Sequence, residues 1–149
     1  MLQCAVDAHL PTDFERAVLK SLAARSGDAA VRRQLANVRI AERDYTVVGC
    51  YSNLQLPIDT VASAAPYAAR GPLMGPCFES KVVKYGGGTL LWFKAGRADC
   101  LEIYVNGDYF PADHSELGDF RLEGQLTERR RAMRQKLRTF WTKLRRAVL

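Results

Sequence analysis

The chain has 149 residues, 48% of them hydrophobic, and a formal net charge of +6. This length suits a single domain with an ordinary core, and the hydrophobic content excludes a largely disordered chain. No apolar run approaches the roughly 20 residues that a membrane-spanning helix needs. The first residues also lack the basic start of a secretory signal, so we expect a cytoplasmic protein.

The cysteines do not form a metal-binding or redox pattern. They are Cys4, Cys50, Cys77 and Cys100, with no Cys-x-x-Cys pair. In a chain without an export signal we expect four reduced thiols, most of them buried. Only His9 and His114 could join them, so we expect neither a structural zinc ion nor any other cofactor.

The positive charge is concentrated at the C-terminus. Residues 127–149 carry nine Lys or Arg and one Glu, a net charge of +8, whereas the other 126 residues carry 13 basic and 15 acidic side chains, a net charge of −2. The body of the protein is therefore mildly acidic, and its attraction for anions belongs to the tail.

Two helices are predicted near the N-terminus. Thr12 and Glu15 have the spacing of a capping box, which starts a helix over residues 13–24. Its apolar stripe consists of Phe14, Val18, Leu19 and Leu22. Asp28 is placed to cap a second helix over residues 29–38, whose apolar positions are Val31, Leu35 and Val38.

Four strands follow. The β-branched and aromatic run over residues 44–51 predicts the first strand. Residues 56–76, with four prolines and two glycines, favour a surface loop. The remaining strands are predicted over residues 78–85, 89–94 and 99–105.

The last two predicted strands form a hairpin with a two-residue turn at Ala95-Gly96. In that register Leu90, Trp92, Leu101 and Ile103 share a core face. The opposite face then holds Leu91, Phe93, Cys100, Glu102 and Tyr104. This second face is too apolar to be fully solvated, so either a helix or a partner is expected to cover it.

The C-terminal segment predicts a long basic amphipathic helix over residues 125–149, following a domain over residues 1–124. Its apolar stripe is Met133, Leu137, Phe140, Trp141, Leu144 and Val148. The surrounding cations are Arg129, Arg130, Arg131, Arg134, Lys136, Arg138, Lys143, Arg145 and Arg146. Either this helix packs on its own domain, or it docks on an anionic membrane, a nucleic acid or an acidic protein.

Two segments carry a family resemblance. They are RDYTVVGCYS over residues 43–52, and GGGTLLWFKAGR over residues 86–97 with the following Leu101-Glu102 and residues 108–111. They resemble an uncharacterised family of small bacterial proteins, with departures at Val47, Ala95 and Ile103. The resemblance implies a compact α+β fold without an established catalytic activity. By analogy with immunity proteins of similar size, it also implies binding and neutralisation of a toxin.

Three groups of residues are candidates for chemistry. The glycines at 86–88 precede a strand rather than a helix with a Lys-Ser/Thr pair, so they predict a bulge or close backbone approach instead of a phosphate loop. Glu102 is either a catalytic acid or, as we favour, a member of a structural or interface ion pair with Arg97 or Arg43. A nucleophilic Cys77 or Cys100 with His114 lacks the cationic setting that lowers a thiol pKa.

The sequence therefore predicts an α+β protein with two N-terminal helices, an antiparallel sheet of about four strands and a basic C-terminal helix. The predicted function is non-catalytic protein binding, in the manner of an immunity or inhibitor protein. The alternative is a peripheral factor that docks on anionic membrane or nucleic acid through its tail, and a hydrolase using Glu102 comes third. The candidate partner-binding residues are Phe93, Arg97, Glu102, Tyr104 and Tyr109.

Overall fold

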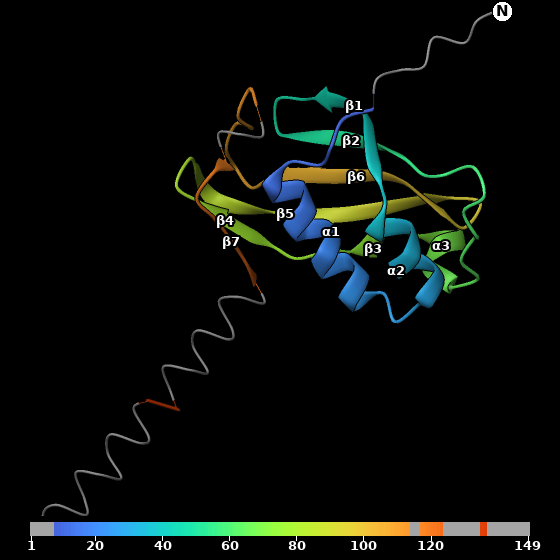
Figure 1. Cartoon of the computed structure of the whole chain (residues 1–149). Coiled ribbons are helices and arrows are strands. Elements are labelled where there is room, and N and C mark those ends of the chain that lie inside the picture. The colour runs from blue at the N-terminus through green and yellow to red at the C-terminus, as the bar shows by residue number, and fades with distance from the viewer. Residues whose placement is uncertain (1–7, 114–116, 124–134, 137–149) are drawn as a thin grey trace, which may run out of the picture.

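A computed structural model describes residues 8–113, 117–123 and 135–136 of the chain (Figure 1). The helices in this part of the chain are α1 (Asp13–Arg25), α2 (Ala29–Ala36) and α3 (Pro66–Arg70). The strands are β1 (Arg39–Tyr45), β2 (Gly49–Gln55), β3 (Leu73–Met74), β4 (Phe78–Ser80), β5 (Val83–Lys94), β6 (Arg97–Val105) and β7 (Phe120–Leu122). The fold is α+β, as the sequence predicts.

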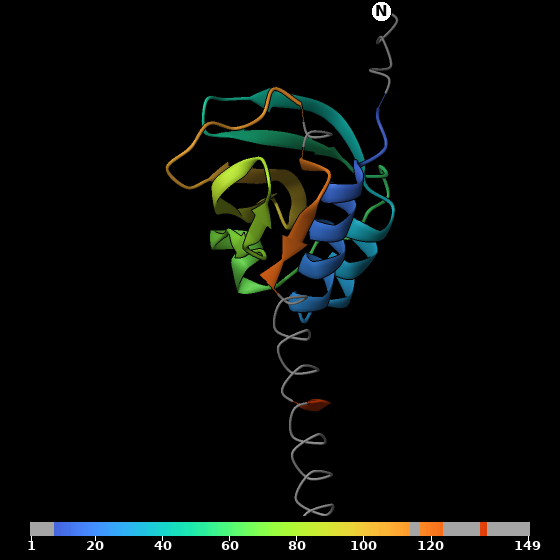
Figure 2. The same ribbon diagram turned by 90° about the vertical axis from the view of Figure 1, so that its left-hand side faces the viewer.

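The described strands form one antiparallel sheet of seven strands. Their order is β1-β2-β6-β5-β4-β7, and β3 pairs with the second half of β5. The two N-terminal helices lie side by side on the same side of this sheet (Figures 1 and 2). The core lies between these helices and the sheet, where the ring of Phe14 from α1 meets that of Phe78 from β4 at 4.9 Å.

Both helices begin where the sequence predicts. The Thr12 hydroxyl accepts from the Glu15 amide, and the Glu15 carboxylate accepts from the Thr12 amide, so the capping box is formed. The Asp28 carboxylate caps α2 by accepting from the Val31 amide at 3.0 Å. The predicted apolar positions of both helices are buried, although α2 ends at Ala36 and Val38 lies in the link to β1.

The segment predicted as a first strand over residues 44–51 is instead a hairpin. The Thr46 amide and hydroxyl both donate to the Gly49 carbonyl, at 2.8 and 3.2 Å, and so close the turn. Val47 and Val48 at its tip are exposed. Neither is a usual turn residue, so no local signal marks a turn at this position. A tertiary bond from the Phe110 amide to the Val47 carbonyl, at 2.8 Å, helps to hold the tip.

A second hairpin was also missed. The predicted strand over residues 78–85 is divided by a turn at Lys81 and Val82, and β5 then runs unbroken through the three glycines to Lys94. Lys81 and Val82, like Val47 and Val48, carry no turn signature.

The β5–β6 hairpin has the predicted turn at Ala95-Gly96 and the predicted pair Lys94–Arg97. Leu101 and Ile103 are buried, as expected. The expected core positions of Leu90 and Trp92 are wrong.

The cause is a β-bulge at Asp99. Trp92 pairs with Cys100 and Phe93 pairs with Ala98, which leaves Asp99 without a partner. One extra residue on β6 shifts the register, so Leu91 rather than Leu90 lies opposite Leu101. Because side chains alternate between faces, the shift moves Trp92 away from the core.

A buried carboxylate joins α1 to the sheet. Glu15 is fully buried and accepts hydrogen bonds from Arg43 Nε and Nη2 at 2.9 and 2.8 Å and from the Ser52 hydroxyl at 2.6 Å. Together with the Thr12 amide, these donors satisfy the charge inside the core. Arg43 lies in β1 and Ser52 in β2, so the network fixes α1 across the first hairpin.

The proline-rich segment over residues 56–76 is not a plain loop, since it contains α3 and β3. The buried side chain of Gln34 in α2 attaches it to the sheet. Its Nε2 donates to the Val61 and Gly96 carbonyls at 2.9 and 3.1 Å, and its Oε1 accepts from the Ala98 amide at 2.8 Å. This one amide therefore holds the loop and the β5–β6 turn together.

The predicted C-terminal helix over residues 125–149 lies outside the described residues except for Gln135 and Lys136, which are exposed. The predictions for the other tail cations stay predictions. None of the described helices combines the length and the apolar composition needed to cross a membrane.

Candidate functional site

The sheet face opposite α1 and α2 carries two rows of paired side chains, which we call the outer face. The register places Asp44, Tyr51, Glu102 and Leu90 in one row across β1, β2, β6 and β5. The adjacent row is Glu42, Asn53, Cys100 and Trp92. Paired residues on adjacent strands point to the same side of a sheet, so these eight side chains share one surface.

The outer face is aromatic and acidic. Trp92 and Tyr51 are each 40% exposed, although large aromatic side chains are usually buried in a core. The two rows contain three carboxylates and neither Lys nor Arg. Tyr and Trp are enriched at protein–protein interfaces relative to the rest of the surface, so the two exposed rings favour a binding surface over a fully solvated sheet.

Glu102 lies at the centre of this surface. The Trp92 indole Nε1 donates to Glu102 Oε2 at 2.7 Å, and the Tyr51 hydroxyl donates to Glu102 Oε1 at 3.4 Å. Tyr51 is the direct cross-strand neighbour of Glu102 and Trp92 is its diagonal neighbour, so the pairing of β2, β6 and β5 positions all three. The carboxylate retains free lone pairs for a further donor.

The carboxylate also affects its neighbours. The negative charge of Glu102 raises the pKa of Tyr51 above its ordinary value, because an ionised phenol there would face a like charge. The Cys100 pKa is raised to about 12, first by burial and then by the charges of Asp99 and Glu102. Both groups are therefore protonated at neutral pH, and Cys100 is no thiolate nucleophile.

A third row extends the surface. Tyr104 pairs with Gly49 on one side and Gly88 on the other. A Cβ atom at Gly88 would collide with the Tyr104 ring, so the glycine gives that ring room to lie over the sheet. The predicted role of the glycines, a close approach of neighbouring groups, is confirmed here.

The structure brings together two of the five predicted partner-binding residues, Glu102 and Tyr104. Phe93 lies on the other side of the bulge, partly buried, with its ring 5.4 Å from that of Tyr67 in α3. Arg97 is exposed beside the β5–β6 turn, and Tyr109 is exposed in the loop after β6. The expected pairing of Glu102 with an arginine is wrong, since Glu102 hydrogen-bonds Trp92 and Tyr51.

Sequence reasoning missed Trp92 and Tyr51 as members of the site. The sequence predicts a core position for Trp92, because the bulge at Asp99 has no sequence signature. Tyr51 alternates with the buried Cys50 and Ser52, so its outward position could have been predicted once β2 was separated from β1.

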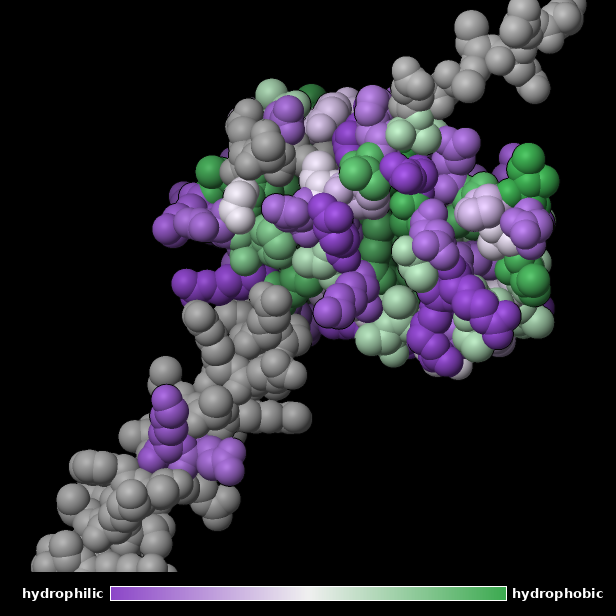
Figure 3. Space-filling view, viewed as in Figure 1, coloured by the Kyte–Doolittle hydropathy of each residue, from purple (hydrophilic) through white to green (hydrophobic). Residues whose placement is uncertain are grey.

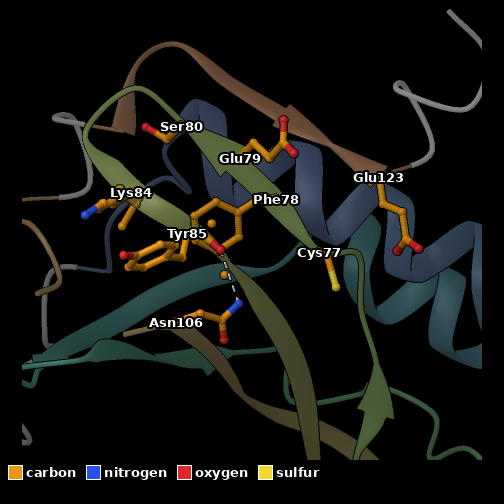
Figure 4. Close-up of a pocket in the computed structure, with 11 residues that line it drawn as sticks. Cys77, Phe78, Glu79, Ser80, Lys84, Tyr85, Asn106 and Glu123 are labelled. Carbon is orange, nitrogen blue, oxygen red and sulfur yellow. Dashed lines mark hydrogen bonds between the residues drawn. The ribbon is translucent and has the colours of Figure 1, made fainter. Parts of the chain in front are cut away.

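A second candidate is a hollow at the β4–β5 hairpin, with a volume of about 550 Å³. Figure 4 shows Lys84 and Tyr85 at one end, Cys77 and Glu123 at the other, and Asn106 below Tyr85, to whose carbonyl it donates at 3.5 Å. Its charged groups are of both signs and do not converge on one point. It is therefore a weaker site than the outer face.

Metal-ligating side chains do not gather in the described part of the chain: no three His, Cys, Asp or Glu residues there are close enough to hold an ion. The described cysteines are unpaired, with Cys50 buried, Cys100 half-buried and Cys77 exposed. His114, the histidine considered as the partner of a cysteine nucleophile, lies outside the described residues.

Comparisons of the chain with protein-family models, with curated proteins and with solved structures found no match.

Proposed function

We propose that this chain is a non-catalytic protein-binding module and that its outer face is the binding surface. The observation that carries the proposal is the exposed Trp92–Glu102–Tyr51 cluster. The hydrogen bonds hold the indole and the carboxylate in place before a partner arrives, which lowers the entropy that binding must overcome.

The chemistry of the cluster favours a partner with a basic side chain. A Lys or Arg placed at Glu102 would find a carboxylate with free lone pairs and two aromatic rings beside it. Carboxylate pairing and cation–π contact both attract such a group. Asp44 and Glu42 in the same rows add negative charge, which would steer a basic surface toward the sheet.

The same cluster supports catalysis poorly. General acid–base chemistry usually needs a second group that exchanges protons near neutral pH. The raised pKa values of Tyr51 and Cys100 keep both protonated there. A carboxylate between two fixed donors is better suited to recognition than to hydrolysis, and we place the Glu102 hydrolase behind the binding module.

The finer proposal is an inhibitor that neutralises a partner by covering it, as immunity proteins do. Its support is the analogy of size and style between immunity proteins and the uncharacterised bacterial family that residues 43–52 and 86–97 resemble, together with an acidic aromatic surface. An inhibitor of a nucleic-acid-binding toxin, for example, would need such a surface to match the toxin's basic groove.

Photo-cross-linking in cells that make the protein tests the proposal. A photoreactive residue at Asn53, in the second row of the outer face, should give one discrete cross-linked protein. The same residue at Arg33, exposed on α2, is the positional control and should not give that product. The cross-linked protein is then purified and its affinity for the intact chain is measured.

We expect Trp92→Ala and Glu102→Gln each to weaken that affinity by about ten-fold or more, as truncation of central interface residues does. Tyr85→Ala is the matched control, because Tyr85 is also an exposed aromatic residue on β5 but lies in the hollow at the β4–β5 hairpin. Equal affinities for all three variants would place the partner elsewhere and reject the proposal.

The alternative partner, an anionic membrane or a nucleic acid, rests on the nine cations of residues 127–149. Cutting the chain after Gly124 should abolish salt-sensitive binding to anionic vesicles or to an oligonucleotide if the tail is responsible. Binding that survives the truncation would rule the tail out.

A further inference from the structure

A groove between α1 and α2 forms a second concave surface, on the side of the molecule opposite the outer face. Its volume is about 570 Å³, within the range of roughly 300–1,000 Å³ that is usual for ligand pockets. Figure 3 shows this side, where a narrow hydrophobic band runs between hydrophilic side chains over the two helices.

The groove has an apolar floor and a basic rim. The floor is formed by Leu19, Ala23, Leu35 and Val38. The rim is formed by Arg16, Lys20, Arg32 and Arg39, and no acidic residue is among the described residues that line the groove. Arg16 and Lys20 are one helical turn apart on α1, so their charges flank the same stretch of floor.

Most of this rim charge is uncompensated. Arg16 meets Asp13 at 3.2 Å, but this pair is largely exposed and such pairs contribute little. Within the described residues, Lys20, Arg32 and Arg39 have no carboxylate within salt-bridge distance. Arg16 also donates to the Pro11 carbonyl at 3.3 Å, and the charge of Arg32 helps to lower the pKa of Asp28. Neither cation is held by a buried countercharge as Arg43 is by Glu15.

We propose that this groove binds an acidic segment of a partner protein, with one or two apolar side chains on the floor and carboxylates against the rim. Charge complementarity identifies the occupant as anionic, and the apolar floor identifies it as amphipathic. Single-stranded nucleic acid fits less well, because its bases stack on aromatic rings and none lines the groove. A membrane surface fits less well, because the site is concave.

The inference is independent of the proposed function, since the two surfaces lie on opposite sides of the sheet and have opposite charge. A partner held on the outer face would carry basic side chains, and one held in the groove would carry acidic ones. The sign of the recognised charge therefore separates the two sites.

Selection of random peptides displayed on phage, with the full chain immobilised, tests the inference. Peptides that combine Asp or Glu with Leu, Ile or Phe should be enriched. They should not compete with basic peptides that bind at the outer face. NMR shift changes in the full chain should centre on Ala23 and Leu35.

Variants then locate the binding. Lys20→Gln/Arg32→Gln should lower the affinity for the selected peptides by about ten-fold or more, because it removes charge on both sides of the floor. The matched control Arg33→Gln/Lys94→Gln lowers the net charge equally at two exposed positions outside the groove, and should change affinity by less than about two-fold. Ala36→Glu places a carboxylate in the lining at an exposed position and should also weaken binding.

Equal losses of peptide affinity in the two double variants would show that the peptides respond only to the net positive charge of the chain, and would overturn the inference. Failure to enrich acidic amphipathic peptides would overturn it as well. Binding of an oligo(dT) probe tests nucleic acid as the occupant. If the probe binds the intact chain and loses affinity only in the groove variants, the groove binds nucleic acid and not an acidic protein segment. The basic tail is identical in every variant, so its own binding of anions cancels in these comparisons.

Discussion

At the scale of single residues, the fold depends on a few polar side chains that are buried with all their partners. Glu15 is the clearest case, because it is fully buried yet accepts from Thr12, Arg43 and Ser52. A buried ion pair adds little net stability compared with an apolar pair, but the loss of one partner strands the other charge. The Arg43 pKa is raised mainly by its hydrogen bonds with Glu15, which shows that the pair favours the charged guanidinium.

Glu15→Gln is therefore expected to destabilise the protein by about 3–5 kcal/mol, measured by denaturant unfolding. The variant keeps the shape of the side chain but leaves Arg43 without its countercharge. Asp13→Asn, which removes the exposed carboxylate of the Arg16 pair, is the control and should change stability by less than about 0.5 kcal/mol. Similar losses of stability in both variants would show that the buried Glu15 network contributes no more to the free energy of unfolding than the exposed Arg16–Asp13 pair.

The buried thiols predict how stability responds to alkaline pH. Burial raises the pKa of Cys50 to about 11 and that of Cys100 to about 12, from an ordinary value of 9.0. The unfolded chain therefore loses these protons at a lower pH than the folded chain. The stability that the two thiols contribute is present below pH 9.0 and is lost as the pH rises through 9.0 toward 11 and 12.

The free energy of unfolding should accordingly fall between about pH 9 and about pH 11, and Cys50→Ala/Cys100→Ala should flatten this fall. Denaturant titrations at several pH values measure it. A slope unchanged in the double variant would assign the alkaline loss to other groups.

At the scale of elements, the β5–β6 hairpin determines which side chains reach the outer face. Its turn needs positive φ at both central residues, and the structure has φ of 51° at Ala95 and 77° at Gly96. Glycine adopts this conformation freely, whereas alanine is strained in it.

Ala95→Asn should stabilise the protein by about 0.5–1 kcal/mol, because Asn tolerates the left-handed conformation of this turn. Thermal and denaturant unfolding measure the gain. Gly96→Ala is the opposing control and should destabilise, since its Cβ would lie 2.6 Å from the Ser63 carbonyl oxygen. A loss of stability in Ala95→Asn would contradict the assigned turn.

Sequence reasoning succeeded where a local rule has a residue signature. The capping box at Thr12 and Glu15 started α1 correctly, and Gly96 marked the turn of the β5–β6 hairpin. It failed where the deciding contacts are tertiary. Turns made from Thr46-Val47-Val48 and Lys81-Val82 have no local signal, so two hairpins were read as single strands.

The candidate site was predictable only in part for the same reason. Glu102 was identified because it is a lone charge in an apolar strand. Trp92 was assigned to the wrong face, since a bulge at Asp99 depends on how β6 meets β5 rather than on the residue itself. The partners of Glu102 therefore emerged only from the register of the whole sheet.

At the scale of the whole molecule, one sheet separates two surfaces of opposite charge. The outer face carries Glu42, Asp44 and Glu102, whereas the α1–α2 groove carries Lys20, Arg32 and Arg39. The core between them is closed by residues of α1, α2 and the sheet. The described part of the chain thus carries two surfaces of different chemistry on opposite sides of its sheet.

The most direct test of the outer face is the accessibility of Trp92 in the full-length protein. The chain has two tryptophans, so Trp141→Phe leaves Trp92 as the only indole. Its 40% exposure predicts red-shifted emission and substantial quenching by acrylamide, less than in the urea-unfolded chain but well above that of a buried indole. Addition of the partner identified by cross-linking should then reduce the quenching of Trp92 by acrylamide. A blue-shifted emission that acrylamide fails to quench in the isolated protein would show that the outer face is covered, and would contradict its role as a docking surface.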